Sequence, residues 1–450
     1  MDNITPLGLG FTLTMGVLLL LLPRRLALIP VLMLTCYMTL GQFIVIAGLH
    51  FYTLRILALF GWLRLLRGEA RGFEFNKVDT AFLWWVFWMF TIYTLQWRSL
   101  EATIYKSGFA YDAINLYFIC RVLIRNQEDV RRTFKVASLL IVPLAAAMLA
   151  EKLTGRNLFA MFGGVLEITR IRDEVLRCQG PFQHPILAGT FGAALLPFSI
   201  ELIWQRRGAK LIGVLGVISS TIITFTSGSS GPVLAWAAAL VGFSFWKFRL
   251  KMRAVRWGLV IMLALLQCFM KVPIWFLIAK VGIFSGSTSY HRAFLIDRAI
   301  AHFGEWFLLG TRSTEHWGPF LADITNMYVR QGVDGGLITL IAFILVMKRC
   351  LSGIGLALRA SENQSLESQK VLWTTGVALL VHLSSMISIN YFDQNIVILY
   401  LSLAAISSLT GKYLSHPKPR AATVGPEHRN SQFGFGNWGS MQSQASETKP

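Results

Sequence analysis

Long apolar runs recur from one end of this chain to the other. Runs of about 18 or more apolar residues are each long enough to cross a hydrocarbon core of roughly 30 Å as a helix. Apolar residues make up 54% of the 450 positions and charged residues only 14%, well below the roughly one-quarter charged fraction of soluble domains. Such a chain cannot bury its apolar surface in water, so the sequence predicts an all-α, polytopic membrane helix bundle.

The formal charge of +19 raises the question of a nucleic-acid partner. That function requires basic residues clustered on one face of a soluble fold. Here they stand between apolar runs instead, for example at 205–210, at 247–256 and at Lys348 and Arg349. This is the distribution that the positive-inside rule gives to cytoplasmic loops. We therefore expect membrane lipids around the chain and no nucleic acid.

Placing the basic segments on the cytoplasmic side gives about 12–13 transmembrane helices within a membrane domain at 1–411. Two long loops, 152–185 and 280–326, then face the periplasm. The segment 412–450 is rich in Ser, Gly, Pro, Gln and Asn, which predicts a disordered cytoplasmic tail. The predicted spans are 7–22, 26–48, 51–66, 80–97, 107–124, 134–151, 186–204, 211–226, 232–247, 257–279, 327–347, 371–389 and 395–411.

The cysteines argue against a disulfide framework and against a bound metal. There are five of them, an odd number, and most lie in or beside apolar runs without the spacing of a pair or of a zinc site. We expect no metal and no cofactor.

Arginines in the 152–185 loop break the charge rule. Arg170, Arg172 and Arg177 lie just before an apolar run on the predicted outer face. A guanidinium is a fixed charge whose planar donors suit phosphate oxygens, so these residues favour an anionic ligand. Equally, they could pair with acids of the same loop or with lipid headgroups.

The same loop ends in a histidine between two prolines. Pro181 and Pro185 flank His184, and proline restricts the backbone, so the chain should enter the next helix at a defined angle. His184 is then a candidate phosphate contact or proton carrier. Alternatively, it caps the helix or faces water.

The 280–326 loop contains a predicted helix at 291–303. His291, Arg298 and His302 fall on one face of this helix, because Arg298 and His302 come seven and eleven residues after His291. Such a helix could lie along the membrane surface and present Arg292 or Arg298 to a phosphate. A plain amphipathic packing helix is an equally good interpretation.

After this helix come the residue types of a sugar-binding site. Arg312, His316, Asp323, Asn326 and Tyr328 lie within a short stretch before the next apolar run. Aromatic faces stack on sugar rings, a carboxylate or an imidazole can remove a proton from an acceptor hydroxyl, and a cation stabilises a departing phosphate. His316 and Asp323 are the candidate bases, although aromatic residues also mark membrane interfaces.

The order of these features resembles the O-antigen ligase and O-antigen polymerase family of bacterial membrane glycosyltransferases. The resemblance covers roughly residues 100–411, and order and topology contribute more to it than any single motif. The matching motifs are 180–189 after a loop arginine, the turn 226–231, Tyr290 to Arg292, Leu309 and Gly310, and Asn326 to Tyr328 before Gly332 and Gly335.

The resemblance implies transfer of a glycan from undecaprenyl pyrophosphate to an acceptor sugar at the periplasmic face of a bacterial inner membrane, without a nucleotide sugar or an essential metal. The acceptor would be a growing glycan or lipid A-core. Arg177 and Arg292 match the family's arginines and would hold the pyrophosphate. Asn326 matches the asparagine of a His-Asn pair, but Thr325 stands where the histidine is expected, which a polymerase tolerates better than a ligase.

Two other functions remain open at this point. The chain could be a polysaccharide transporter or flippase, or a non-catalytic partner in a polysaccharide assembly complex. Transporters usually place charged groups near the middle of spans and contain related halves. Mid-span charges are few in this sequence and no repeat is visible, so the polar loops favour an enzyme.

Overall fold

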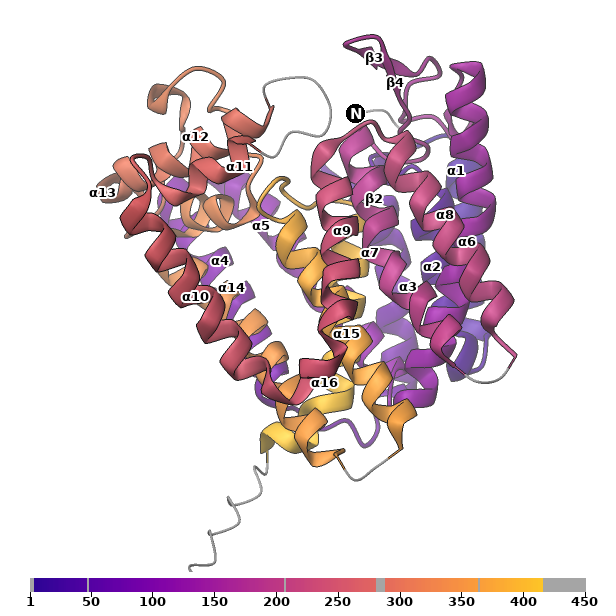
Figure 1. Cartoon of the computed structure of the whole chain (residues 1–450). Helices are drawn as coiled ribbons and strands as arrows, with labels where there is room; N and C mark the ends of the chain where they lie inside the picture. Colours follow the sequence, from indigo (N-terminus) through magenta and orange to yellow (C-terminus); the bar gives the residue numbers. More distant parts are fainter. Residues whose placement is uncertain (1–3, 47, 206–207, 281–287, 363–364, 416–450) are drawn as a thin grey trace, which may run out of the picture. The chain divides into compact units, whose positions relative to one another are not determined.

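The computed structural model describes residues 4–46, 48–205, 208–280, 288–362 and 365–415. The predicted tail from residue 416 onward, and residues 281–287 of the predicted large loop, lie outside these ranges. Within them the chain is almost entirely helical (Figure 1), which confirms the all-α class. The longer helices are α1 (Pro6–Leu21), α2 (Leu28–Tyr37), α3 (Thr53–Arg64), α4 (Lys77–Trp97), α5 (Leu100–Leu123), α6 (Gln127–Thr154), α7 (Pro185–Trp204), α8 (Lys210–Thr226), α9 (Ser230–Ser244), α10 (Met252–Phe269), α12 (Thr288–Ala301), α14 (Met327–Ala360), α15 (Leu366–Ser385) and α16 (Gln394–Ser415).

Short elements connect these helices. Two antiparallel hairpins, β1 with β2 and β3 with β4, and an isolated bridge between Arg156 and Ile168 are the β-structure of the described residues. The short elements are η1 (Arg24–Leu26), β1 (Phe43–Ile46), β2 (Leu49–Tyr52), η2 (Leu65–Glu69), η3 (Leu158–Phe162), β3 (Arg170–Arg172), β4 (Val175–Arg177), η4 (Phe245–Lys251), η5 (Ile274–Phe276), α11 (Leu277–Lys280), α13 (Phe303–Trp306) and η6 (Glu315–Trp317).

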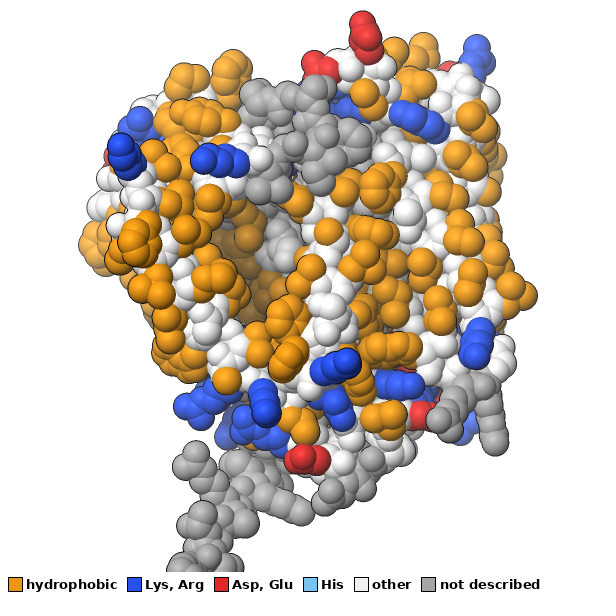
Figure 2. Space-filling view, in the orientation of Figure 1, with side chains coloured by type: hydrophobic (Ala, Val, Ile, Leu, Met, Phe, Trp, Pro, Cys, Tyr) orange, Lys and Arg blue, Asp and Glu red, His pale blue; other side chains and the backbone are white. Residues whose placement is uncertain are grey.

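Six helical segments of the described chain are long and apolar enough to cross a membrane. They are α4, α6, α7, the continuous stretch Ser230–Phe269, α14 and most of α16, while α1 and α8 are apolar but shorter. Five of them each overlap one predicted span. The stretch Ser230–Phe269 covers the predicted span 232–247 and only part of 257–279, because α10 ends at Phe269 and short elements follow it. An apolar belt covers the face drawn in Figure 2, and Lys and Arg side chains gather below it. The chain is a helical membrane protein.

The predicted span 26–48 is wrong. It is divided into η1, the ten-residue helix α2 and the first strand of the β1–β2 hairpin. The run Ile44 to Ile46 is β-branched, which favours a strand, and Gly48 has a φ of 78°, a left-handed conformation that suits a tight turn. Hydropathy alone could not distinguish this strand from a continuous helix.

Helix α14 is longer than predicted. The span 327–347 was expected to end at the basic pair Lys348 and Arg349, but the helix continues to Ala360. It is also interrupted at Gly336, whose φ is 67°. There the amide of Leu337 donates to the carbonyl of Phe307 at 2.8 Å, so the outer loop supplies the acceptor that the broken helix lacks.

Helix α7 occupies the centre of the bundle. It packs against α6, α8, α9, α15 and α16. Of the residues in its most apolar 18-residue segment, 83% are buried. Small residues permit this close packing: a Cβ at Gly189 would collide with Ser227 Oγ, and one at Gly192 would lie 2.8 Å from Ile223 Cγ2. Glycines at helix contacts let backbones approach closely in membranes.

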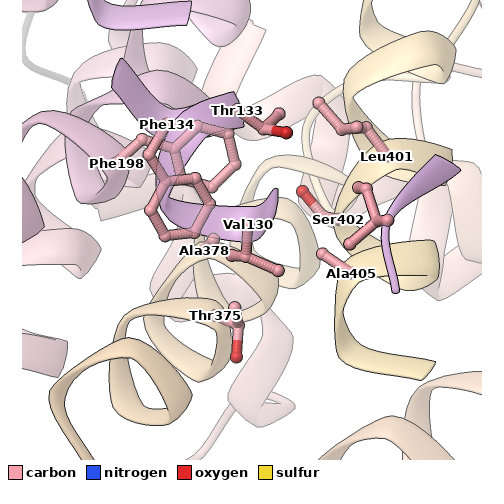
Figure 3. Close-up of a pocket in the computed structure, with 10 residues that line it drawn as sticks. Val130, Thr133, Phe134, Phe198, Thr375, Ala378, Leu401, Ser402 and Ala405 are labelled. Atoms are coloured by element: carbon pink, nitrogen blue, oxygen red, sulfur yellow. The ribbon is translucent and has the colours of Figure 1, made fainter. Parts of the chain in front are cut away.

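The interior beside α7 is tightly filled. Figure 3 shows a cavity of about 10 Å³, which can hold one water at most. Its wall comes from α6, α7, α15 and α16 and consists mostly of apolar side chains, with Thr133, Thr375 and Ser402 as polar exceptions. This part of the core is therefore not a ligand site.

A buried carboxylate joins α4, α5 and α16. Asp79 is fully buried and accepts hydrogen bonds from the amide of Asn76 at 2.9 Å, the hydroxyl of Tyr117 at 2.5 Å and that of Ser407 at 2.8 Å. Arg121 forms an ion pair with it at 3.3 Å. The network fixes one end of three long helices to one another.

Replacing Asp79 with alanine should strongly destabilise the protein. Removal of one partner of a buried ion pair costs about 3–5 kcal/mol, so the midpoint of thermal unfolding of the purified chain in detergent should fall clearly. Glu128→Ala is the control, because Glu128 is 70% exposed in its 3.6 Å pair with Arg132 and such pairs contribute little. Equal losses in both variants would contradict this account.

Candidate functional site

The loop before α7 is held in place by a carboxylate of α6. Glu151 accepts the backbone N–H groups of Gln179 at 3.0 Å and Gly180 at 2.9 Å, and the hydroxyl of Thr169 at 3.1 Å. Asn157 donates to the carbonyl of Gly180 at 2.7 Å. These bonds give the loop one conformation and so define where the residues on either side of it lie.

His184 ends this loop as the N-cap of α7. Its Nδ1 accepts the amide of Ile186 at 3.2 Å, so the proton of the neutral ring is on Nε2. Burial lowers the pKa of His184 to about 4, with Arg177, Arg170 and Arg172 adding to the effect. The ring is therefore neutral at pH 7 and can donate from Nε2, but it does not change charge there.

Arg177 is the last residue of the β3–β4 hairpin, and its side chain extends to the turn between α8 and α9. Its Nη2 donates to Ser229 Oγ at 2.7 Å. Its Nε atom is buried and has no hydrogen-bond partner among the described residues. Burial lowers the pKa of Arg177, as do Arg172 and Arg170, which shows that several cations share this part of the molecule.

Arg292 lies on the buried face of α12 and not on its polar face. It is 5% exposed and shares this face with Leu295 and Ala299, three and seven residues further along. Its Nη1 atom is buried without a partner in the described chain. Burial lowers the pKa of Arg292 to about 10, and Arg172 and Arg177 lower it further.

Arg292 meets the first turn of α9 and the loop after α15. A Cβ at Gly231 would lie 3.4 Å from Arg292 Nη2 and 2.7 Å from Ser388 Oγ, so only glycine fits between them. Residue 387, next to Ser388, accepts a hydrogen bond from Asn326 at 3.0 Å. Both predicted loops thus converge on the α8–α9 turn and on the loop 386–393.

The converging arginines have no acidic partner in the part of the chain that the structure describes. Among the described residues neither Arg177 nor Arg292 forms an ion pair, and the segment 281–287 contains no acid in its sequence. A buried charge without a counterion is costly unless a ligand pairs with it. The arrangement is therefore suited to an anion with several oxygens, such as a phosphate or a pyrophosphate.

Asn326 and Tyr328 form hydrogen bonds within the protein. Asn326 caps α14, because its Oδ1 accepts the amides of Tyr328 at 2.9 Å and Val329 at 3.1 Å. The hydroxyl of Tyr328 donates to the carbonyl of Leu383 at 3.0 Å. Arg298 lies with its guanidinium 4.9 Å from the ring centre of Phe294. These contacts do not test a substrate role.

Arg312 belongs to a separate pocket of about 170 Å³ beside the end of α4. Its guanidinium donates twice to the carbonyl of Gln96, at 3.0 and 2.6 Å. Asp334 and Arg330 of this pocket belong to an ionic cluster that sequence analysis missed, in which Asp334 accepts from Lys106 and from Arg330, both at 2.9 Å. Arg330 and Asp334 are one helical turn apart, but Lys106 lies 228 positions before Asp334, so no local pattern joins it to the cluster.

The predicted base His316 lies apart from the arginines. His316 Nε2 is 2.7 Å from Glu305 Oε2, and His302 Nδ1 is 2.6 Å from Glu305 Oε1. Hydrogen bonds from Trp317 and the two histidines lower the pKa of Glu305 to about 2. Since ten residues of helix span roughly 15 Å, His302 and its neighbours are well separated from Arg292.

Asp323 is exposed and has no hydrogen bond or ion pair with the described residues. Sequence analysis missed a second acid, Asp393, in the loop 386–393. Its Oδ2 atom is buried without a partner in the described chain, and burial, with a smaller effect of Asp112, raises its pKa to about 7. The next residue, Gln394, donates to the carbonyl of Pro181 at 3.3 Å, so this loop borders the one before α7.

Replacing Glu151 with glutamine should destabilise the loop before α7. A side-chain NH₂ would face one of the two backbone N–H donors, and a buried donor without an acceptor costs about 1–3 kcal/mol. Thermal unfolding in detergent should show a lower midpoint for Glu151→Gln. Glu167→Gln is the matched control, because Glu167 is 67% exposed and 3.7 Å from Arg156; unchanged stability of both variants would contradict the prediction.

The site thus combines Arg177 and Arg292, which have no acidic partner among the described residues, with His184 as a neutral donor. Asp393 is a buried acid of the loop 386–393, which borders the loop before α7. Such groups can bind an oxyanion and, if the acid can reach the substrate, accept a proton. Comparison with known proteins gives no match, either to a protein-family model or to a curated protein.

Proposed function

We propose that this chain is a membrane glycosyltransferase that moves a glycan from an undecaprenyl-pyrophosphate carrier to an acceptor sugar. The setting would be O-antigen or exopolysaccharide synthesis at the periplasmic face of a bacterial inner membrane. Polymerase activity is favoured over ligase activity, because Thr325 stands where the resembling family has a histidine.

The observation that carries the proposal is the convergence of Arg177 and Arg292. They are 115 positions apart, come from the two loops predicted to be periplasmic, and lie near enough that Arg177 lowers the pKa of Arg292. A pyrophosphate has enough oxygens and charge for both guanidinium groups. His184 could add a neutral donor from Nε2.

The reaction requires little beyond positioning and charge stabilisation. The acceptor hydroxyl attacks the anomeric carbon of the donor glycan and a new glycosidic C–O bond forms. The C–O bond to the pyrophosphate breaks, and undecaprenyl pyrophosphate leaves with the electron pair. The two arginines would stabilise the charge that develops on the leaving group, and a carboxylate or histidine would take the proton of the acceptor hydroxyl.

The exterior of the bundle also suits a glycan donor that is linked to a lipid carrier. None of the residues of α10 is buried, and the face drawn in Figure 2 is hollowed beside this helix, with apolar side chains around the depression. An apolar helix in that position leaves hydrocarbon access toward the interior. This supports a substrate whose carrier remains in the bilayer.

The alternatives are a transporter and a non-catalytic assembly partner. In a transporter, uncompensated charges are expected along a path near the middle of the spans. Here most buried charges of the helices are paired with one another, as in Lys106 with Asp334, or accept backbone N–H groups, as Glu151 does. Arg177 and Arg292, which have no ion pair among the described residues, lie in a loop and near the start of α12. This distribution favours chemistry at one surface.

Arg292→Lys and Arg177→Lys should each reduce glycan transfer by about 10- to 100-fold, because an ammonium keeps the charge but loses the two-pronged donor geometry. The measurement is complementation of a deletion strain, with gels of lipopolysaccharide and secreted polysaccharide and with protein levels matched. Arg156→Lys, an exposed loop arginine, is the control. A deletion strain with unaltered glycans would refute the function itself.

The gels also distinguish the possible activities. Loss of all long glycan on lipid A-core with polymer still present indicates a ligase, and loss of chain extension indicates a polymerase. Normal glycan transfer by Arg292→Lys would remove this residue from the proposed site while leaving the function open to the other arginine.

The rate of transfer should rise with pH through about 7 if Asp393 is the base. Its raised pKa means that the carboxyl is protonated, and unable to accept a proton, below this value. Asp393→Asn should then lower the rate by about 10²- to 10⁴-fold and abolish the rise. The assay uses purified protein in proteoliposomes with a lipid-linked donor.

His316→Ala and Asp323→Ala are measured in parallel, because sequence analysis predicts these residues as bases. Loss of the pH dependence in either of them, with a normal profile in Asp393→Asn, would assign the base to the outer loop. A normal profile in all three variants would mean that positioning alone supports the reaction.

A further inference from the structure

A second cationic site lies far along α14 from Asn326. The C-terminal half of α14 and the segment from η4 into α10 line a groove of about 560 Å³. Five of its thirteen lining residues are cations: Arg249, Arg253, Arg256, Lys348 and Arg359. The remaining ones are apolar or small, and none is an acid.

The charge in this groove is not compensated by the protein. In the part of the chain that the structure describes, none of the five cations forms an ion pair. Arg249 is held in place, since its Nε donates to Gln369 at 2.9 Å and its guanidinium lies 4.2 Å from the ring centre of Trp246. Five like charges around one volume repel each other, so an anion that fits there is bound favourably.

The groove is also apolar on one side. Trp257 and Val260 of α10 line it and are 60% and 52% exposed, and Leu351 and Leu356 face them from α14. None of the residues of α10 is buried, so hydrocarbon must cover this helix in a bilayer. A ligand with a charged head and apolar chains matches both halves of the lining.

We propose that this basic groove binds the phosphodiester headgroup of an anionic phospholipid, with its acyl chains along α10. Basic pockets between membrane helices on the cytoplasmic side are suited to such headgroups, and the groove lies among the basic segments that the positive-inside rule assigns to that side. A bound lipid would join α10 to α14 where few protein contacts do. The proposal is independent of the glycan-transfer function.

The test is native mass spectrometry of the purified full chain in detergent, titrated with phosphatidylglycerol or with phosphatidylcholine. The wild type should bind phosphatidylglycerol much more tightly. The groove variant R253Q/R256Q/R359Q should lose about two orders of magnitude in phosphatidylglycerol affinity, since each cation near an anionic lipid contributes about fivefold. The corresponding triple lysine variant should retain most of it.

The matched control removes three cations of the basic segments that lie outside the groove. The control variant K77Q/K135Q/K210Q replaces exposed lysines near the starts of α4, α6 and α8. It changes the net charge by the same amount as the groove variant, but its affinity for phosphatidylglycerol should stay close to that of the wild type. An equal loss in this control would overturn the proposal, as would an unchanged lipid preference in the groove variant.

Inorganic phosphate is added as a competitor at the lipid concentration. Displacement of phosphatidylglycerol by phosphate would mean that the groove binds a small soluble anion and would overturn the assignment to lipid. Should the triple glutamine variant fail to fold, R253Q/R256Q leaves α14 intact and carries the same test with about a fivefold smaller effect.

Discussion

The hydrocarbon of a bilayer offers no hydrogen bonds, so a polar group within it must find its partner inside the protein. Asp79 accepts from three hydrogen-bond donors and pairs with a fourth group, Arg121, and Lys106 pairs with Asp334. Against this background a buried group without a partner carries information. Among the described residues Nη1 of Arg292 is such a group, and an anionic ligand would satisfy it.

Hydropathy predicted much of the fold, because a run of apolar residues that fills the membrane has few alternatives to a helix. This prediction failed where a segment was long and apolar enough for a span but its local conformation was not helical. The segment 26–48 contains β-branched residues and a glycine with positive φ at position 48, so it turns into a hairpin. It also failed at Lys348, because a charge ends the apolar run but does not end the helix, which continues to Ala360.

The site was predictable to the extent that single residues broke a rule. Arg177 and Arg292 stood out as cations on the predicted outer side, and the structure brings their loops together. Sequence analysis also predicted Asn326 as a site residue. The structure shows it as the cap of α14, a role that asparagine before a helix commonly has. Asp393 was missed, because one acid in a short turn has no spacing signature, and only the burial around it reveals the raised pKa.

The interruption at Gly336 divides α14 into two rigid pieces of unequal length. The shorter one begins after its cap Asn326 and is joined to the preceding loop by the hydrogen bond from the amide of Thr311 to the carbonyl of Val333, whereas the bond from Leu337 to Phe307 belongs to the longer one. The longer one reaches the basic groove at Lys348 and Arg359. A straight helix would act as a lever between its ends, whereas a jointed one lets each end tilt on its own. Tilting of the longer piece at the basic groove can therefore leave Asn326 and its contact with the loop 386–393 in place.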